Sequence, residues 1–197
     1  MTGDGIEWTR LALGADVVQM LLPHRRPFLL VDAVEAIVLG RKPMLRARKM
    51  VSANEPVLEG HFPGLSLWPG VYTIEGLGQT TNLLNLIGGL IDAAATENLA
   101  PEAVLDALRG LEKRVRPGAS KPTPEEERLV AALGAPRSRI GFAGAIDVKL
   151  IEPVYAGTVL EYRVTQTHVI ANARRFDVEA RVLDRPVARG TVTSATP

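Results

Sequence analysis

The chain has 197 residues, of which 46% are hydrophobic and 23% are charged, so it can bury a full core as a single domain over residues 1–197 without disulfides. Its formal net charge of +1 gives no reason to expect binding to nucleic acid, and the absence of cysteine excludes a disulfide framework, a thiolate metal site and a cysteine nucleophile. Residues 1–10 lack the pattern of a signal peptide and no apolar run is long enough to span a membrane, so we expect a soluble, cytoplasmic enzyme or binding module.

The first part of the chain predicts a short helix followed by two strands. Apolar spacing and turn residues place these elements at residues 15–22, 33–39 and 44–51. In the second strand, Leu45, Ala47 and Lys49 share one face. Arg46 and Arg48 share the opposite face, which we expect to be exposed.

A loop rich in glycine and proline then leads into a long helix. Residues 59–70 contain five of these residues, which indicates a shaped loop rather than a helix or strand. Pro69 suits the start of a helix, because the first N–H groups of a helix have no intrahelical partner. Residues 71 to about 90 contain no proline and are apolar on most sides, so we expect a long, largely buried helix.

The stretch from about residue 92 to 139 predicts a charged helical insertion. One helix is expected from Pro101 to Arg114. A second is expected to begin at Thr123 or Pro124, before three glutamates that favour a helix N-terminus, and to end near Gly134. Because the stretch is charged and broken by prolines, we expect a surface lid or a partner site rather than a core element.

Strands return after Gly141. Alternating patterns predict them at residues 145–151, 159–169, 173–183 and 187–193. Strands that flank one long buried helix predict an α+β fold, in which an antiparallel sheet wraps around the helix.

Two polar residues stand out as candidates for chemistry: His61 in the glycine–proline loop and Glu75 in the apolar helix. Glu75, Gln79 and Asn82 form one polar stripe at helical spacing. A carboxylate buried in such a helix is costly unless it is paired or neutralised, and a neutral carboxyl group suits a general acid. Histidine, with an ordinary pKa of about 6.5, suits a general base. Taken singly, a loop histidine is more often structural, and a helix glutamate more often faces solvent.

The two candidates occur together in a recognisable frame. The run Gly60-His61-Phe62-Pro63-Gly64-Leu65-Ser66-Leu67-Trp68-Pro69-Gly70, followed by Ile74-Glu75-Gly76-Leu77-Gly78-Gln79, resembles the active-site segment of β-hydroxyacyl-[acyl carrier protein] dehydratases of the FabZ type. Residues 22–32 and 149–158 are similar to the opening motif and a later strand of the same family, in the same order. The resemblance covers roughly residues 15–90 and 141–193.

This resemblance implies a hot-dog fold and the dehydration of a β-hydroxyacyl thioester to the trans-2-enoyl thioester, in fatty-acid or polyketide-like biosynthesis, with no cofactor and no metal. His61 falls on the family's catalytic base and Glu75 on its catalytic carboxylate. Gly70 falls on the glycine whose N–H binds the thioester oxygen. We expect Phe62, Trp68 and Gln79 to contact substrate, with the bulky Trp68 limiting the acyl chain or packing in the core.

The resemblance also implies partners. The substrate is carried on an acyl carrier protein, and the family works as homodimers, or larger homo-oligomers, in which the histidine of one subunit faces the carboxylate of the other. The insertion has no counterpart in short family members, and its basic residues are candidates for docking an acidic carrier protein. These residues are Arg109, Lys113, Arg114, Arg116 and Lys121.

The chain departs from the family inside the long helix. Gly76 and Gly78 stand where the family has alanine, and each interior glycine costs about 1 kcal/mol relative to alanine. We expect close helix packing, including packing at a dimer seam, or room for an unusual acyl chain, to compensate.

Two other functions remain open on this fold. One is a thioesterase, in which an acidic residue or a histidine activates water, although the spacing of His61 and Glu75 argues against it. The other is a catalytically silent subunit that binds an acyl chain or a protein, although the presence of both residues argues against that. We interpret His24 and His168 as structural.

Overall fold

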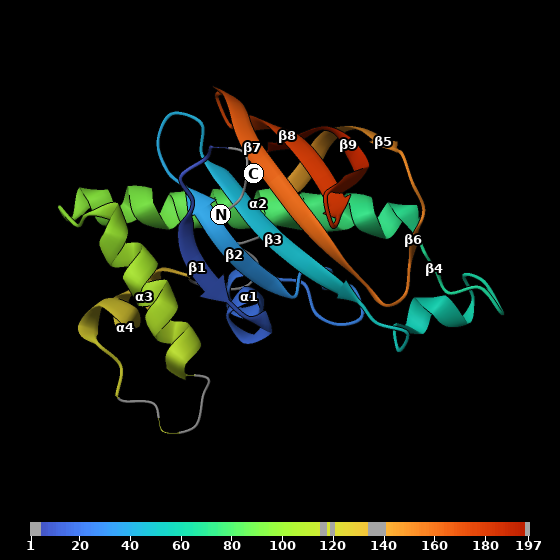
Figure 1. Ribbon diagram of the computed structural model, residues 1–197. Coiled ribbons are helices and arrows are strands. Elements are labelled where there is room, and N and C mark those ends of the chain that lie inside the picture. The colour runs from blue at the N-terminus through green and yellow to red at the C-terminus, as the bar shows by residue number, and fades with distance from the viewer. Residues whose placement is uncertain (1–4, 115–117, 119–120, 134–140, 196–197) are drawn as a thin grey trace.

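A computed structural model of the chain describes residues 5–114, 118, 121–133 and 141–195. A seven-stranded antiparallel sheet lies across the 27-residue helix α2 (Gly70–Thr96), in the order β1-β2-β3-β7-β8-β9-β5 (Figure 1). The strands are β1 (Thr9–Leu13), β2 (Ala33–Val38), β3 (Met44–Val51), β5 (Phe142–Leu150), β7 (Thr158–Ile170), β8 (Ala173–Val182) and β9 (Arg185–Ala195). This arrangement is the expected hot-dog fold.

Shorter elements complete the chain. They are α1 (Ala15–Leu21), the 3-10 helix η1 (Pro56–Glu59), the strand pair β4 (Leu67–Trp68) and β6 (Val154–Tyr155), α3 (Pro101–Arg114) and α4 (Pro124–Ala132). The bounds of β3 and α3 agree with those predicted from the sequence, whereas α2 continues six residues past the predicted end. Strand β1 was not predicted. No helix in the described ranges is long and apolar enough to cross a membrane.

The core lies between α2 and the inner face of the sheet. On β7 the alternation predicted from the sequence is confirmed, because Leu160, Tyr162 and Val164 are each 0% exposed. They meet apolar side chains of α2 such as Leu77 and Ile87, which are also fully buried. Complete burial of one such aliphatic side chain contributes about 1.5–3 kcal/mol, so this contact fixes the helix on the sheet.

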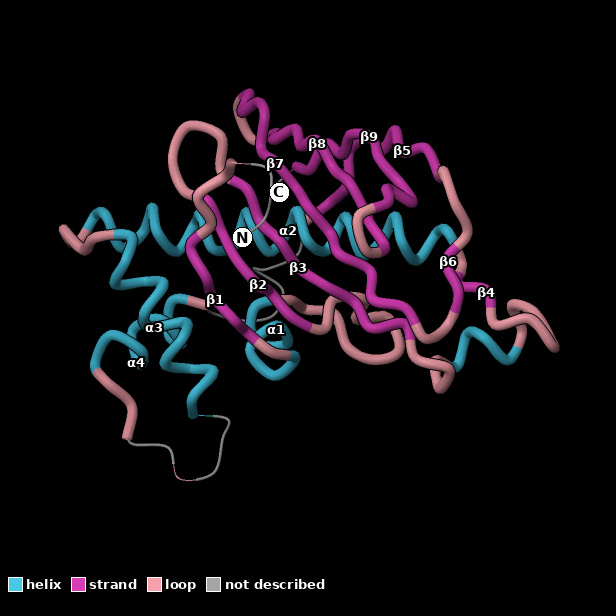
Figure 2. Tube along the Cα trace, viewed as in Figure 1, coloured by secondary structure: helices cyan, strands magenta, loops and turns pink. Residues whose placement is uncertain are grey.

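The first helix of the insertion belongs to the core, which corrects the expectation of a surface lid. Helix α3 contacts α1, α2 and β1, at the end of α2 that is far from the β4–β6 pair (Figure 2). The side chains that it buries are Val104, Leu105, Ala107, Leu108 and Leu111. The charged residues noticed in the sequence occupy the other side of an amphipathic helix, where Arg109, Glu112 and Arg114 contact other parts of the chain.

Helix α3 also covers the outer edge of the sheet at β1. The guanidinium group of Arg109 donates to the backbone carbonyl of Arg10 through Nε (3.0 Å) and Nη2 (2.6 Å). The carboxylate of Glu112 accepts from the backbone N–H of Gly14 at 2.7 Å. Unpaired backbone groups on an edge strand are a template for association, and these contacts occupy part of that edge.

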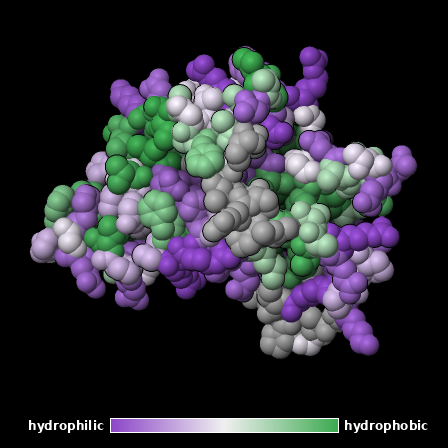
Figure 3. Space-filling model, turned by 180° about the vertical axis from the view of Figure 1, so that it is seen from behind, coloured by the Kyte–Doolittle hydropathy of each residue, from purple (hydrophilic) through white to green (hydrophobic). Residues whose placement is uncertain are grey.

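The opposite edge of the sheet, at β5, is open. Eight of the nine residues of β5 are exposed, and Val148 is partly buried. The exposed residues include Phe142, Ile146 and Leu150, which are 58%, 52% and 48% exposed. The view from behind shows hydrophobic surface at this end of the sheet (Figure 3). The two edges therefore differ: one is covered by the chain itself and the other presents apolar side chains to solvent.

The position of α3 in the core makes a stability prediction. We expect Leu108→Ala to lower the free energy of unfolding by about 2–5 kcal/mol, the usual effect of a large-to-small change in a core. Val130→Ala on α4, where the side chain is 50% exposed, is the matched control and should change it by less than about 0.5 kcal/mol. Urea denaturation measures both values. A Leu108→Ala protein as stable as the control would mean that α3 is only an appendage.

Candidate active site

The loop after β3 fixes the position of His61 and the tautomer of its neutral ring. The backbone N–H of His61 donates to the carbonyl of Val57 at 3.1 Å, which ties the residue to η1. Its ring Nδ1 lies 2.8 Å from the carbonyl oxygen of Leu67. Because a carbonyl oxygen only accepts, the neutral ring carries its proton on Nδ1 and leaves a lone pair on Nε2. The ring is therefore oriented as a base.

His61 lies in one cleft with the start of helix α2. The cleft has a volume of about 260 Å³ and is lined by His61, Leu67, Trp68, Gly70, Thr73, Leu150, Ile151, Glu152, Pro153, Val154 and Val187. Pro69 is the N-cap of α2 and provides no side-chain cap. A helix N-terminus offers N–H groups without intrahelical partners and the positive end of the helix dipole. A side chain at Gly70 would collide with Leu150, so glycine allows Leu150 to pack closely against this turn.

Glu75 lies one and a half turns into α2 with two neighbours. Its Oε1 accepts from Nε2 of Gln79 at 3.0 Å and lies 3.6 Å from Nε2 of His24. The expected deep burial is wrong for the single chain, because the Glu75 side chain is 34% exposed. The sheet covers the opposite side of the helix, and the segment with Phe28 and Leu30 covers Gln79, one turn further on, more completely than it covers Glu75.

Gln79 is buried and bonded within the chain, and its expected contact with substrate stays a prediction. It is 1% exposed, and its amide oxygen accepts from the backbone N–H of Leu30 at 2.8 Å. Its Nε2 donates to the carbonyl of Phe28 at 2.8 Å as well as to Glu75. With both ends of the amide bonded inside the chain, Gln79 anchors the segment before β2 to α2 and holds Glu75.

His24 is the neighbour of Glu75 that sequence reasoning missed. Burial lowers the pKa of His24 below its ordinary value, while the Glu75 carboxylate opposes that shift and Arg25 adds to it. A lowered pKa favours the neutral ring, which suits its half-buried position next to Phe28. The only signal in the sequence was its place in the 22–32 motif, which gives no information on this contact.

The two candidate catalytic residues do not meet within one chain. In the described part of the molecule no hydrogen bond or ion pair joins His61 to Glu75, and the carboxylate that shares the cleft with His61 is that of Glu152. Glu152 lies 3.4 Å from Arg185 and is 40% exposed. The structure thus contains two half-sites, one built around His61 and one around Glu75.

The two expected aromatic contacts differ in exposure. Trp68 is 2% exposed and packs edge-on against Tyr72 at 5.4 Å between ring centroids, so it belongs to the core while one side lines the cleft. Phe62 is 50% exposed and stacks on the His61 ring at 4.2 Å. Among the described residues, no group of three or more histidine, aspartate or glutamate side chains is arranged to hold a metal ion.

The two unusual glycines of α2 face different surroundings. A side chain at Gly76 would fall on the hydroxyl group of Tyr162, so close packing on β7 explains this glycine. A side chain at Gly78 would meet nothing within 4 Å, so this position is open in the single chain. From the sequence, close packing or free space was expected to offset the cost of these glycines. Close packing is found at Gly76, and free space is found at Gly78.

Comparisons with known proteins agree on one family. The sequence model described as a FabA-like domain matches residues 22–121, which include His61 and Glu75. A 3-hydroxyacyl-[acyl-carrier-protein] dehydratase FabZ of Myxococcus xanthus is 38% identical over 146 residues, covering 72% of this chain and 88% of the relative. The FabZ of Blochmanniella pennsylvanica is 42% identical over 111 residues, covering 54% of this chain and 67% of the relative.

A solved structure supports the fold. A chain of the dehydratase heterocomplex ApeI:P from Xenorhabdus doucetiae superposes with a TM-score of 0.56 at 16% identity, covering 91% of this chain and 90% of that one. At that level of identity the likeness concerns the fold alone.

The two glycines make a paired prediction. Gly76→Ala should lower the free energy of unfolding by about 1–3 kcal/mol, because the added methyl group must displace Tyr162. Gly78→Ala should not lower it, and the better helix propensity of alanine favours a gain of up to about 1 kcal/mol. Urea titration of both variants under identical conditions measures the difference. Equal effects at the two positions would contradict the packing assigned to Gly76.

Proposed function

The chain belongs to the FabA-like family and, within it, to the 3-hydroxyacyl-[acyl-carrier-protein] dehydratases, and we propose that it removes water from its substrate with His61 as base and Glu75 as acid. The substrate is a 3-hydroxyacyl group on an acyl carrier protein, and the product is the trans-2-enoyl thioester. The observation that carries this assignment of roles is the cleft in which a histidine with a free Nε2 lies beside the N-terminus of α2.

Each step of the reaction has a group suited to it. Nε2 of His61 takes a proton from the carbon next to the thioester, and the resulting negative charge collects on the thioester oxygen. The N–H of Gly70, at the positive end of α2, stabilises that charge. As the double bond forms, the bond from the β-carbon to its hydroxyl group breaks, and a proton from Glu75 completes the water that leaves.

The contacts of Glu75 support its part as an acid. An N–H of Gln79 donates to Oε1, which orients the carboxyl group and leaves Oε2 as the oxygen that can act on the substrate. Gln79 is buried and bonded to two backbone groups, which keeps the carboxyl group in one orientation. A fixed donor of this kind is worth about 10²–10⁴ in rate for a general acid.

A second copy of the chain completes the site in this proposal. We propose a homodimer in which His61 of one subunit faces Glu75 of its partner, because the two residues occupy separate half-sites in one chain. The open β5 edge, with Phe142, Ile146 and Leu150 exposed, supplies apolar surface for such a pair. The docking of a carrier protein on the insertion stays a prediction, for which Lys113 and Lys121 are the exposed candidates. Arg109 and Arg114 already make contacts inside the chain, and Arg116 lies outside the described residues.

The assignment of base and acid predicts two losses of activity. We expect His61→Ala and Glu75→Gln each to lower kcat at least about 10²-fold while the protein stays folded. Turnover of a 3-hydroxyacyl group on an acyl carrier protein, followed by the absorbance of the enoyl product, measures the effect. Glu152→Gln is the competing variant, because Glu152 shares the cleft with His61. A larger loss for Glu152→Gln than for Glu75→Gln would transfer the role of acid to Glu152.

The shared site predicts complementation between two inactive variants. A mixed dimer of His61→Ala and Glu75→Gln subunits contains one site with both residues intact and one site with neither. After unfolding and refolding of an equal mixture, random pairing should restore about one quarter of the wild-type activity. If the mixture stays as inactive as its components, although subunit exchange is confirmed by mass spectrometry, each site belongs to a single chain.

A further inference from the structure

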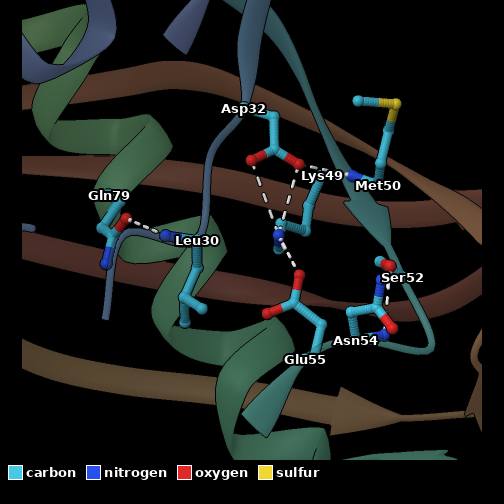
Figure 4. Close-up of polar contacts among 8 residues, drawn as sticks. All are labelled: Leu30, Asp32, Lys49, Met50, Ser52, Asn54, Glu55 and Gln79. Carbon is cyan, nitrogen blue, oxygen red and sulfur yellow. Dashed lines mark hydrogen bonds and ion pairs between the residues drawn. The ribbon is translucent and has the colours of Figure 1, made fainter. Parts of the chain in front are cut away.

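A buried lysine outside the proposed chemistry connects the two half-sites. Lys49 is 6% exposed and points from the inner face of β3 into the molecule. Its ammonium nitrogen lies 2.5 Å from Oε1 of Glu55 and 3.3 Å from Oδ2 of Asp32, so one cation sits between two carboxylates (Figure 4). A buried charge is costly to maintain, and here it is retained in a cluster that neither abstracts nor donates a proton in the reaction.

The Glu55 side of the cluster leads to His61. Glu55 precedes η1, and its carbonyl accepts from the backbone N–H of Leu58 at 3.0 Å. In the same turn, the carbonyl of Val57 accepts from the N–H of His61 at 3.1 Å. The ion pair with Lys49 therefore holds the residue just before η1, the short helix that positions the His61 backbone.

The Asp32 side of the cluster leads to Glu75. Asp32 stands two residues after Leu30, whose N–H is held by Gln79, and Gln79 also donates to Glu75. Asp32 is itself fixed on β3, because its Oδ2 accepts from the N–H of Met50 at 2.8 Å. Figure 4 shows both ends of this segment, with the Gln79–Leu30 contact on one side and the Lys49 cluster on the other.

The ammonium group also lies over Trp68, 5.9 Å from the centre of its ring. Trp68 comes two residues before Gly70, the first residue of α2. A cation at this distance from an indole face is attracted to it. Lys49 thus contacts the segments that lead to the base, to the acid and to the oxyanion donor.

We propose that Lys49 is a positioning residue for the dehydration, which aligns His61 and the support of Glu75 by holding Glu55 and Asp32 around one buried ammonium group. This inference rests on the proposed function for the reaction that is measured. Displacement of a reacting group by about 1 Å costs on the order of 10²-fold in rate, so a loosened loop has a measurable effect without any loss of a catalytic side chain.

Glu55→Ala is the variant that separates positioning from folding. It leaves Lys49 paired with Asp32, so no buried charge is left alone, and it removes the ion pair to Lys49 while keeping the backbone hydrogen bonds of the turn. We expect kcat per folded molecule to fall about 10- to 100-fold with KM within about threefold of wild type. In a crystal structure of the variant, the His61 ring should lose its contact with the Leu67 carbonyl. That second readout does not depend on the reaction and stands even if the substrate class is wrong.

Lys49→Met removes the cation itself, and Lys49→Arg tests rescue by the conservative change. Arg48→Met is the matched control, because it removes the same charge one residue away, where the side chain is 46% exposed and pairs with Glu35. We expect the kcat of Lys49→Met to fall at least as far as that of Glu55→Ala. Lys49→Arg should recover part of this loss, and the kcat of Arg48→Met should stay within twofold of wild type.

Assays are made well below the melting temperature of each variant, with the folded fraction measured by circular dichroism. A folded Glu55→Ala protein with kcat within about twofold of wild type and His61 undisplaced would overturn the proposal, whether or not Lys49→Met folds. If the wild-type chain itself fails to dehydrate carrier-bound substrates, the proposed function fails. In that case, the crystal structure of Glu55→Ala is the remaining test of the positioning role.

Discussion

A single sheet covers only one side of a helix, and the uncovered side of α2 determines how the site is arranged. The covered side carries Leu77, Ile87 and the close contact of Gly76 with Tyr162. The uncovered side carries Glu75, which is one-third exposed, and Gly78, beside which there is free space. The acid of the proposed reaction therefore lies where the chain cannot enclose it, and His61 opens into a different cleft. Both facts are consistent with the proposed homodimer, in which a second subunit brings the two residues together.

Polar groups inside this fold serve to hold segments in place as much as to react. Gln79 bonds two backbone groups of the segment before β2 and the carboxylate of Glu75. Lys49 joins the end of that segment to the start of the His61 loop. Each is nearly fully buried, so its bonds are protected from water, where such contacts are worth less. In the proposed dimer, the two ends of this support serve different active sites, since one leads to His61 and the other to Glu75.

The sequence predicted the elements well where local pattern decides them. The bounds of β3 follow from strict alternation, and Pro101 together with the basic end at Arg114 define α3. Strand β1 was missed because a register shift between Arg10 and Leu13, with a positive φ at Ala12, disrupts the alternation on which strand prediction relies. The chemical candidates were found through motif spacing. Their neighbours were not, because the contact of His24 with Glu75 and the three bonds of Gln79 depend on how distant segments pack. The burial of α3 was not predicted for a similar reason. Its charged residues led to the expectation of a surface element, and its apolar side is buried only through contacts with distant segments.

The covering of β1 by Arg109 and Glu112 has a consequence for behaviour at high concentration. A sheet with two free edges can add a neighbour at each end and polymerise without limit, as amyloid-like assemblies do. A sheet with one free edge can add a single neighbour, after which no free edge remains. By occupying part of the β1 edge, helix α3 hinders the addition of a strand at that end, so edge-to-edge growth is expected mainly at the apolar β5 edge, where the first neighbour uses up the free edge.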